Sequence, residues 1–399
     1  MNPTLAWLDF NAAERERTQR ILAMFDEKET RDELGLGAIR DSISDHLFPG
    51  TSTIQTRLRY LFFIPWIYLR LERQRVPSRE IATKARKLET ELTTPLLGQI
   101  DNAGVFGRLA KGGLKRLPSS VYWAGLRQYG ICLYPGGRED YHRDLDAIYR
   151  RRDRTRHESD GGPEPFQFTW HPKLPEPQPN FPEHPRFRLT RAEGHFFRDC
   201  LMRPSCNDSL LAHLAWHCEP AEVDFPWQHP RLGSFSDKHQ ELLENARLFS
   251  ITMHGAAILY NLLLAEAGSL GDLEITYRDA FQQWAREMAP DRHRVEKWIL
   301  HRFWQVARHP AHTITTQAQS FVKSWVGLFL EHGSRVVSRE DARKLVRNRE
   351  VHLKGPRSRF QNPRALEKWG GEAGLRPVAY RWYNAKTFLR DLAEGLKNQ

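Results

Sequence analysis

The stretch FPGTSTIQTRLRYLFFIPWIY, residues 48–68, decides how the first part of the chain folds. Its Phe-Pro-Gly opening interrupts a preceding helix, and Thr51, Ser52 and Thr53 are residue types that cap helix N-termini. We therefore expect a helix over residues 54–64, with a kink or an end at Pro65. The start of such a helix could hold a phosphate, whereas its apolar end looks like the beginning of a membrane span.

The length of the apolar run argues against a membrane span. Residues 60–69 form a run of 10 that contains a proline and is bracketed by arginines. A second run, residues 256–265, is also 10 long and is interrupted by an asparagine. Because a spanning helix needs about 20 apolar residues, we expect neither run to cross a bilayer. The stretch is then a capped helix that packs in a core, and Arg57 and Arg59 are predicted to face nucleic acid.

Composition predicts a globular protein of the cytoplasm. Of the 399 residues, 40% are hydrophobic and 27% are charged, which is the balance of a folded chain and not of a disordered one. The N-terminal sequence MNPTLAWLDFNAAERERTQR lacks the basic and apolar regions of a signal peptide. Four cysteines in a chain of this length fit a reducing compartment.

Positive charge is concentrated near the C-terminus. The formal net charge is +11, and residues 335–399 hold 16 Lys and Arg against 7 Asp and Glu. This gradient favours a polyanionic partner, and nucleic acid over anionic lipid, because no amphipathic anchor or lipidation motif accompanies it. A GC-rich genome explains the abundance of arginine equally well, but it does not explain the clustering.

Helical periodicity predicts a mainly α, multi-helical fold. The longest helix is expected at residues 237–267, where apolar residues recur at spacings of 3 and 4 and form a seam that faces the core or a protein partner. Capping boxes at Thr190 and Ser338 mark two further helix starts. Other helices are expected at residues 14–25, 31–47, 79–92, 277–288, 292–307, 317–330, 339–351 and 380–396.

A proline-rich segment divides the chain. Residues 149–188 combine charged runs with repeated prolines, which is typical of an extended linker. Its Trp170-His171 and Phe181-Pro182 islands indicate contact with a domain surface. We predict an N-terminal helical domain at 1–150, a Pro-rich linker at 151–189, a central helical domain at 190–334 and a basic C-terminal helical region at 335–399.

Residues 105–131, VFGRLAKGGLKRLPSSVYWAGLRQYGI, have the dimensions of a helix-turn-helix. A short apolar and basic helix is expected to end at Gly112-Gly113, and a second helix to start at Pro118. A helix-turn-helix places its second helix in the DNA major groove. We therefore expect nucleic-acid contacts from Lys111, Lys115, Arg116 and Arg127.

The loop HLKGPRSRFQNPR, residues 352–364, is the second predicted contact. Gly355 permits close backbone approach, Pro356 stiffens the loop, and the next helix offers free N–H groups at its start. The alternative is an ordinary solvated surface, on which runs of charge are common. The predicted phosphate-binding residues are Lys354, Arg357, Arg359 and Arg364.

Catalytic signatures are absent or incomplete. His142-Arg143-Asp144 matches a kinase tripeptide, but neither the required Asn nor an Asp-Phe-Gly motif follows. Two His-x-Lys pairs are similar to those of phospholipase-D-type nucleases, but the Asp expected five residues after each Lys is missing. We therefore predict no catalytic residue and no cofactor.

The best metal candidate is a group of cysteines and histidines at residues 200–218. His213 and His217 have the i, i+4 spacing of metal ligands on a helix. The cysteines lack the spacing of a zinc knuckle, so the sequence leaves open whether Cys200, Cys206, His213, His217 and Cys218 bind a metal. His301, His309 and His312 are weaker candidates.

Several blocks of the sequence resemble a known family. These are TRDELGLGAIRDSISDHLFPGTSTIQTRLRYLFFIPWIY, LPSSVYWAGLRQYGI, LYNLLLAE, KGPRSRFQNPRALEKW and YRWYNAKTFLRDL. Over essentially the whole chain the sequence is similar to a family of uncharacterised bacterial proteins, a domain of unknown function. The resemblance brings no activity and no catalytic residue. It implies an association with helicase, methyltransferase or nuclease components of anti-phage loci.

We expect a non-enzymatic, DNA-interacting accessory component of a bacterial defence or DNA-processing system. Its expected partners are nucleic acid, in the first place duplex DNA, and protein components of the same system, without a membrane. One alternative is a protein-interaction scaffold that uses the helix at 237–267. Another is a nuclease whose site is assembled from residues distant in sequence.

Overall fold

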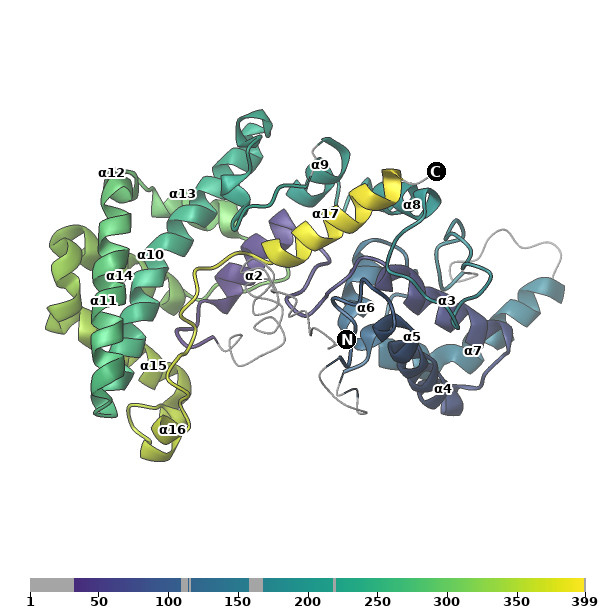
Figure 1. The fold of residues 1–399 in the computed structure, drawn as a ribbon, viewed down its shortest axis with the longest axis horizontal. Helices are drawn as coiled ribbons and strands as arrows, with labels where there is room; N and C mark the ends of the chain where they lie inside the picture. The colour runs from purple at the N-terminus through teal and green to yellow at the C-terminus, as the bar shows by residue number, and fades with distance from the viewer. Residues whose placement is uncertain (1–31, 109–113, 115, 158–167, 218–219, 398–399) are drawn as a thin grey trace, which may run out of the picture. The chain divides into compact units, whose positions relative to one another are not determined.

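The computed structural model describes residues 32–108, 114, 116–157, 168–217 and 220–397 (Figure 1). Throughout these residues the regular elements are α-helices and short 3-10 helices, and β pairing is limited to one isolated bridge between Cys132 and Trp170. The predicted mainly α, multi-helical fold is confirmed. The helix predicted at residues 14–25 lies outside the described residues.

The helices pack into two compact units, each made of segments that are far apart in the sequence. Unit 1 consists of Met1–Gly37, Ser250–Trp298 and Thr315–Pro377, and unit 2 of Ala38–Phe249, Ile299–Ile314 and Val378–Gln399. None of these breaks falls at the boundaries predicted near residues 150, 189 and 334. Those boundaries mark changes of composition along the chain, and as domain boundaries they stay a prediction.

Unit 2 contains residues 48–68 and the helices that pack against them. In it, α3, α4, α6 and α7 pack against one another, and α17 packs against α8 and α9 (Figure 1). Its helices are α2 (Gly37–Leu47, from its second residue), α3 (Tyr60–Arg73), α4 (Ser78–Glu91), α5 (Thr93–Leu97), α6 (Pro118–Gln128), α7 (Arg138–His157), α8 (Arg191–Leu201), α9 (Leu210–His217), η2 (Pro226–Gln228), η3 (Leu232–Ser234), the first part of α10 (Asp237–Ala267), α13 (Leu300–Ala307) and α17 (Trp382–Lys397).

The helix α3 begins later than predicted and is not ended by its proline. It starts at Tyr60 instead of residue 54, and it continues through Pro65 to Arg73. Pro65 removes one backbone hydrogen bond. The residues on both sides of it are buried nearly all round the helix, and this packing keeps the helix intact.

The segment before α3 is not helical because distant side chains hold its backbone. The hydroxyl of Tyr122 accepts hydrogen bonds from the N–H groups of Thr56 and Arg57, at 2.8 and 3.0 Å. The carboxylate of Asp391 accepts from the N–H of Leu58 at 2.9 Å. These N–H groups therefore have partners without forming a helical turn.

The predicted linker is helical at its start and packed against unit 2 at its end. The helix α7 continues to His157, inside the segment predicted to be extended. Farther on, Trp170 is buried and donates from Nε1 to Glu72 at 3.1 Å, and the ring of Phe181 stacks on that of Phe63. The two aromatic islands therefore lie on a domain surface, as predicted.

Unit 1 contains the second part of α10, which α11 and α14 contact. The indoles of Trp284 and Trp325 donate to the α10 carbonyls of Ile251 and Thr252, at 2.8 and 2.9 Å. Gly255 permits this approach, since a Cβ there would lie 2.3 Å from the Trp284 ring. The other elements are α11 (Gly271–Met288), η4 (Ala289–Asp291), α12 (Arg292–Glu296), α14 (Thr316–His332), η5 (Gly333–Ser338), α15 (Glu340–Lys354), η6 (Gly355–Arg357) and α16 (Pro363–Glu367).

The long helix α10 occupies the predicted residues, Asp237–Ala267. Among the described residues it is the one helix long and apolar enough to cross a membrane, but 83% of its apolar window is buried inside the protein. Of the two predicted roles for its seam, core packing is therefore the observed one. Leu242, Phe249, Tyr260 and Leu264 are all buried.

One of the two predicted capping boxes forms. Thr190 forms the predicted capping box with Glu193 at the start of α8. Ser338 does not cap α15, because residues 333–338 form the 3-10 helix η5 and Arg339 occupies the cap position. The single helix predicted at 292–307 is broken into α12 and α13, at the point where the chain passes from one unit to the other.

Glu89 of α4 is a buried acid with an incomplete set of partners. It is 1% exposed, and its Oε2 accepts from the backbone N–H of Ser119 at 2.7 Å. Its Oε1 has no hydrogen-bond partner among the described residues. Burial raises the pKa of Glu89 to about 7, against the opposing effects of the Ser119 amide, Arg138 and Arg86.

Glu89→Gln is expected to flatten the dependence of stability on pH. The folded pKa of about 7 lies above the unfolded value of 4.5, so the folded state keeps a proton that the unfolded state releases. Stability from this group is therefore full below about pH 4.5 and is lost as pH rises to about 7, by up to about 3 kcal/mol. Urea unfolding at about pH 5 and about pH 8 measures the difference. Glu91→Gln, at an exposed position of the same helix, is the control, and equal slopes in both variants would contradict the assignment.

Candidate functional site

Arg57 and Arg59, predicted to face nucleic acid, are buried in ion pairs within unit 2. Arg57 is 7% exposed, and its Nη2 lies 2.9 Å from Asp391 Oδ1. Arg59 is 1% exposed, with its Nη2 2.7 Å from Glu193 Oε1. A guanidinium that is buried against a carboxylate offers no surface to a phosphate. The prediction for these two residues is therefore corrected: they hold unit 2 together.

The predicted helix-turn-helix stays a prediction, because most of its first helix lies outside the described residues. Lys111 and Lys115 also lie outside the described residues. The second helix, α6, is buried along most of its surface, and the Tyr122 hydroxyl is bonded inside unit 2. Arg116 and Arg127 are exposed.

The loop after α15 uses two of its predicted phosphate ligands internally. Lys354 Nζ pairs with Glu33 and lies 3.1 Å from Glu350 Oε1. Arg359 Nη1 lies 2.9 Å from Glu33 Oε2 and donates to the Tyr260 hydroxyl at 2.7 Å. Both carboxylates are buried, so these cations neutralise acids of unit 1 instead of projecting toward a ligand.

Gly355 has a local structural role in the same loop. Its φ of +52° is in the left-handed region, and its N–H donates to the carbonyl of Val351. A residue with a Cβ rarely adopts a positive φ, so glycine is favoured at this helix end. Lys354 and Arg359 are engaged internally, and phosphate binding by the rest of this loop stays a prediction.

Five cations of the same segment are exposed, and we call them the basic surface of unit 1. Arg357 and Arg364 were predicted contacts, and both are exposed in the structure. On α15, the side chain of Lys344 is 64% exposed. The five residues are Lys344, Arg347, Arg357, Arg364 and Lys368.

The cysteine and histidine group predicted as the best metal candidate is only partly assembled. Cys200 and Cys206 are buried thiols, and burial raises the pKa of Cys200 to about 12. The rings of His213 and His217 lie 5.0 Å apart. Cys218 lies outside the described residues. Among the described residues, three ligand-type atoms converge elsewhere, at Asp45, His309 and His312.

This second cluster joins α2 to the loop after α13, both within unit 2. Asp45 Oδ2 lies 2.6 Å from His312 Nε2. The ring of His309 lies 5.6 Å from that of His312 and 4.9 Å from that of His46. One candidate ligand atom from each of Asp45, His309 and His312 lies within 4.8 Å of the other two. The three residues are half-buried.

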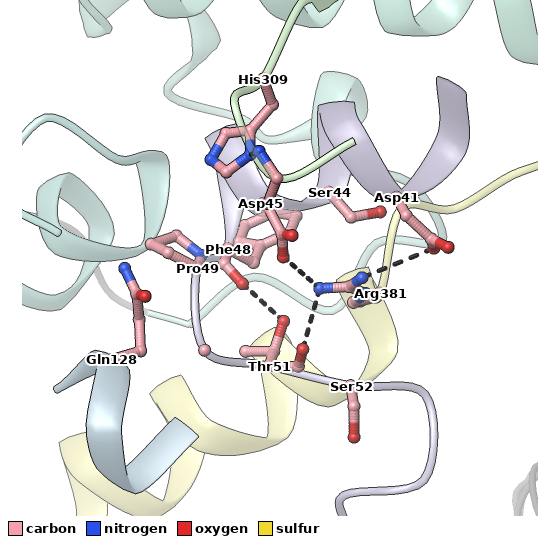
Figure 2. A network of polar contacts seen from close by, with 12 residues as sticks. Asp41, Ser44, Asp45, Phe48, Pro49, Thr51, Ser52, Gln128, His309 and Arg381 are labelled. Carbon is pink, nitrogen blue, oxygen red and sulfur yellow. Dashed lines mark hydrogen bonds and ion pairs between the residues drawn. The ribbon is translucent and has the colours of Figure 1, made fainter. Parts of the chain in front are cut away.

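Arg381 fixes the carboxylate of this cluster (Figure 2). Its guanidinium faces Asp45, Asp41 and the carbonyl of Thr51, with Nη1 2.5 Å from Asp45 Oδ1 and 2.9 Å from Thr51 O. Asp41 and Asp45 are one turn apart on α2, which places both on the side of Arg381. Although burial alone would raise the pKa of Asp41, Arg40 and Arg381 hold it below its usual value.

The backbone at Arg381 is held in an uncommon conformation. Tyr380 and Arg381 have φ angles of +51° and +63°. Such angles cost a non-glycine residue about 1 kcal/mol or more. The ring of Tyr380 is buried and its hydroxyl donates to the carbonyl of Ala246 at 2.7 Å, which stabilises the turn. The position of the guanidinium is thus set by the packing of Tyr380 and by the bonds of Arg381 to Asp45 and to the Thr51 carbonyl.

Two polar contacts hold the histidine loop against α2. The hydroxyl of Ser42 donates to the carbonyl of Ala307, and His46 Nε2 lies 2.9 Å from the carbonyl of Arg308. Asp45 could not have been connected with His309 and His312 from the sequence. The His-x-x-His spacing was the only local signal, and it does not indicate a partner in α2.

The internal pairing of Lys354 predicts a clear difference between two neighbouring positions. Lys354→Ala is expected to lower the free energy of unfolding by on the order of 2 kcal/mol, because Glu33 and Glu350 stay buried with one cation fewer. Arg357→Ala is expected to change it by less than about 0.5 kcal/mol. Urea denaturation followed by circular dichroism measures both. If both variants changed the free energy of unfolding by equally small amounts, the internal pairing of Lys354 would be contradicted, and Lys354 would be counted with the basic surface.

Comparison with known proteins adds a family but no activity. No curated protein and no solved structure matches the chain. A family described as a family of unknown function (DUF6361) matches residues 2–395. The resemblance to a domain of unknown function is confirmed, and the link to anti-phage loci stays a prediction. The chain belongs to this family of unknown function.

Proposed function

We propose that the protein binds nucleic acid, in the first place duplex DNA, through the basic surface of unit 1. The proposal rests on the cations that remain exposed in this part of unit 1. After Lys354 and Arg359 are assigned to buried acids, five exposed cations remain at 344–368, against one exposed acid, Glu367.

The residue types on this surface fit a phosphate backbone. Arginine binds phosphate oxygens with two parallel N–H donors, and lysine adds a point charge. The surface combines three arginines with two lysines on a short segment. Contacts of this kind position a protein on nucleic acid without reading its sequence, so we expect binding to differ little between duplexes of different sequence.

The proposal includes a non-enzymatic role in the cytoplasm, as an accessory component of a bacterial defence or DNA-processing system. Its support is the resemblance of the quoted sequence blocks and the incomplete catalytic motifs. In this role the protein brings other components of the system to DNA. The scaffold alternative is weakened, because the α10 seam on which it relied is buried.

The salt dependence of binding tests the proposed surface. In the triple variant Arg357→Gln, Arg364→Gln, Lys368→Gln, we expect weaker binding to a labelled duplex and a flatter plot of log K against log salt. Each phosphate that the variant no longer neutralises reduces the slope by about 0.9, so three reduce it by about 2.7. Fluorescence anisotropy at several salt concentrations gives the slope, with single-stranded DNA and RNA as further arms.

A matched control removes the same charge from another surface. Arg79→Gln, Lys84→Gln, Lys87→Gln lies on α4 of unit 2, where the three side chains are 85, 48 and 76% exposed. We expect this variant to keep most of the slope. An equal decrease in both triple variants would show that only net charge matters, and unchanged binding in the first would contradict the basic surface.

A further inference from the structure

We propose that Asp45, His309 and His312 bind a divalent transition-metal ion of the kind represented by Zn²⁺. The inference is independent of nucleic-acid binding, since the three residues belong to unit 2 and the basic surface to unit 1. They come from two segments more than 260 residues apart, yet their ligand-type atoms lie within 4.8 Å of one another.

The ligand set fits the chemistry of such an ion. Two imidazole nitrogens and one carboxylate oxygen are a common set for zinc and iron(II), and they leave coordination positions open. Tetrahedral ligands at 2.0–2.1 Å from an ion are about 3.3 Å from each other. The pair Asp45 Oδ2 and His312 Nε2, now 2.6 Å apart, would separate by less than about 1 Å, and no other pair would have to close by more than about 1.5 Å.

The carboxylate is already oriented for this purpose. Arg381 binds Oδ1 of Asp45, whereas Oδ2 lies 2.6 Å from Nε2 of His312. Metal-binding carboxylates usually have such a hydrogen bond on their other oxygen, which fixes their direction. The guanidinium is shared with Asp41, so its charge does not act on Asp45 alone.

His309 must give up one weak contact. Its Nδ1 accepts from the backbone N–H of Ala311 at 3.2 Å. Ligation through Nδ1 replaces this bond, and ligation through Nε2 needs a proton on Nδ1, so either route ends it. Ala311 is exposed, so water can then bond to its N–H.

A simple ion pair explains less of the arrangement. It accounts for the contact of Asp45 with His312, but it gives no reason for His309 to face the same point. Three imidazoles, those of His46, His309 and His312, lie together here with ring centroids 4.9 and 5.6 Å apart.

Titration of the full-length protein with Zn²⁺ after treatment with a chelator tests the proposal. We expect one bound ion per chain by calorimetry and by elemental analysis after desalting. His309→Ala and His312→Ala are each expected to weaken binding at least tenfold. His301→Ala, an exposed histidine of the neighbouring helix α13, is the matched control and should bind as the unaltered protein does.

His309→Ala is the decisive variant, because it separates the loss of metal binding from a loss of folding. It leaves the pairs of Asp45 with Arg381 and with His312 in place and removes only the ring contact with His46 and the weak bond from Ala311, so the variant should still fold cooperatively without metal. The Zn²⁺-induced rise in melting temperature should disappear in it. The double variant Cys200→Ser, Cys206→Ser should keep both binding and this rise. The proposal would be overturned if the protein bound no Zn²⁺, or if binding survived the removal of His309 and His312. It would also be overturned if only the cysteine variant abolished binding.

Discussion

Unit 2 depends on buried arginine–carboxylate pairs that join distant parts of the chain. Arg57 meets Asp391, and Arg59 meets Glu193, across 334 and 134 residues of sequence. A guanidinium inside a protein is strongly destabilising unless a carboxylate and carbonyl oxygens replace its water, so each pair restricts which segments can pack together. Asp391 also accepts the N–H of Leu58, which fixes the chain just before α3. The conformation of the chain where it enters α3 is therefore set by a residue of α17, near the C-terminal end of the described residues.

Much of the helical pattern could be predicted from local sequence, because apolar periodicity and local caps are properties of neighbouring residues. The helix α10 was predicted with both of its ends, and the capping box of Thr190 with Glu193 forms as expected. The start of α3 could not be predicted, because the side chains that hold the preceding backbone come from α6 and α17. Pro65 was expected to end or kink the helix. It does not end it, because α3 continues to Arg73 with buried residues on both sides of the proline.

The exposure of individual cations could not be predicted. Lys354, Arg357 and Arg359 lie within six residues and have similar chemistry, yet only Arg357 is exposed. The partner of the other two, Glu33, precedes them by more than 320 residues. The same holds for the metal candidate, since Asp45 is separated by 267 residues from His312 and by 336 from Arg381. A sequence pattern identifies the residue types of a site, and only the fold shows which of them meet.

The pairing of buried charges also determines where a ligand can act. Pairs such as Arg57 with Asp391 are neutral as a whole, so they contribute nothing to the formal net charge of +11, which residues outside such pairs carry. That excess favours a polyanion at the surface. At Asp45 the situation is reversed, because Oδ1 is bound by a permanent cation, whereas Oδ2 faces His312, which is charged only when protonated. In the proposed site, a metal ion would supply at Oδ2 the fixed positive charge that Arg381 supplies at Oδ1, and two neutral imidazoles would be its other protein ligands.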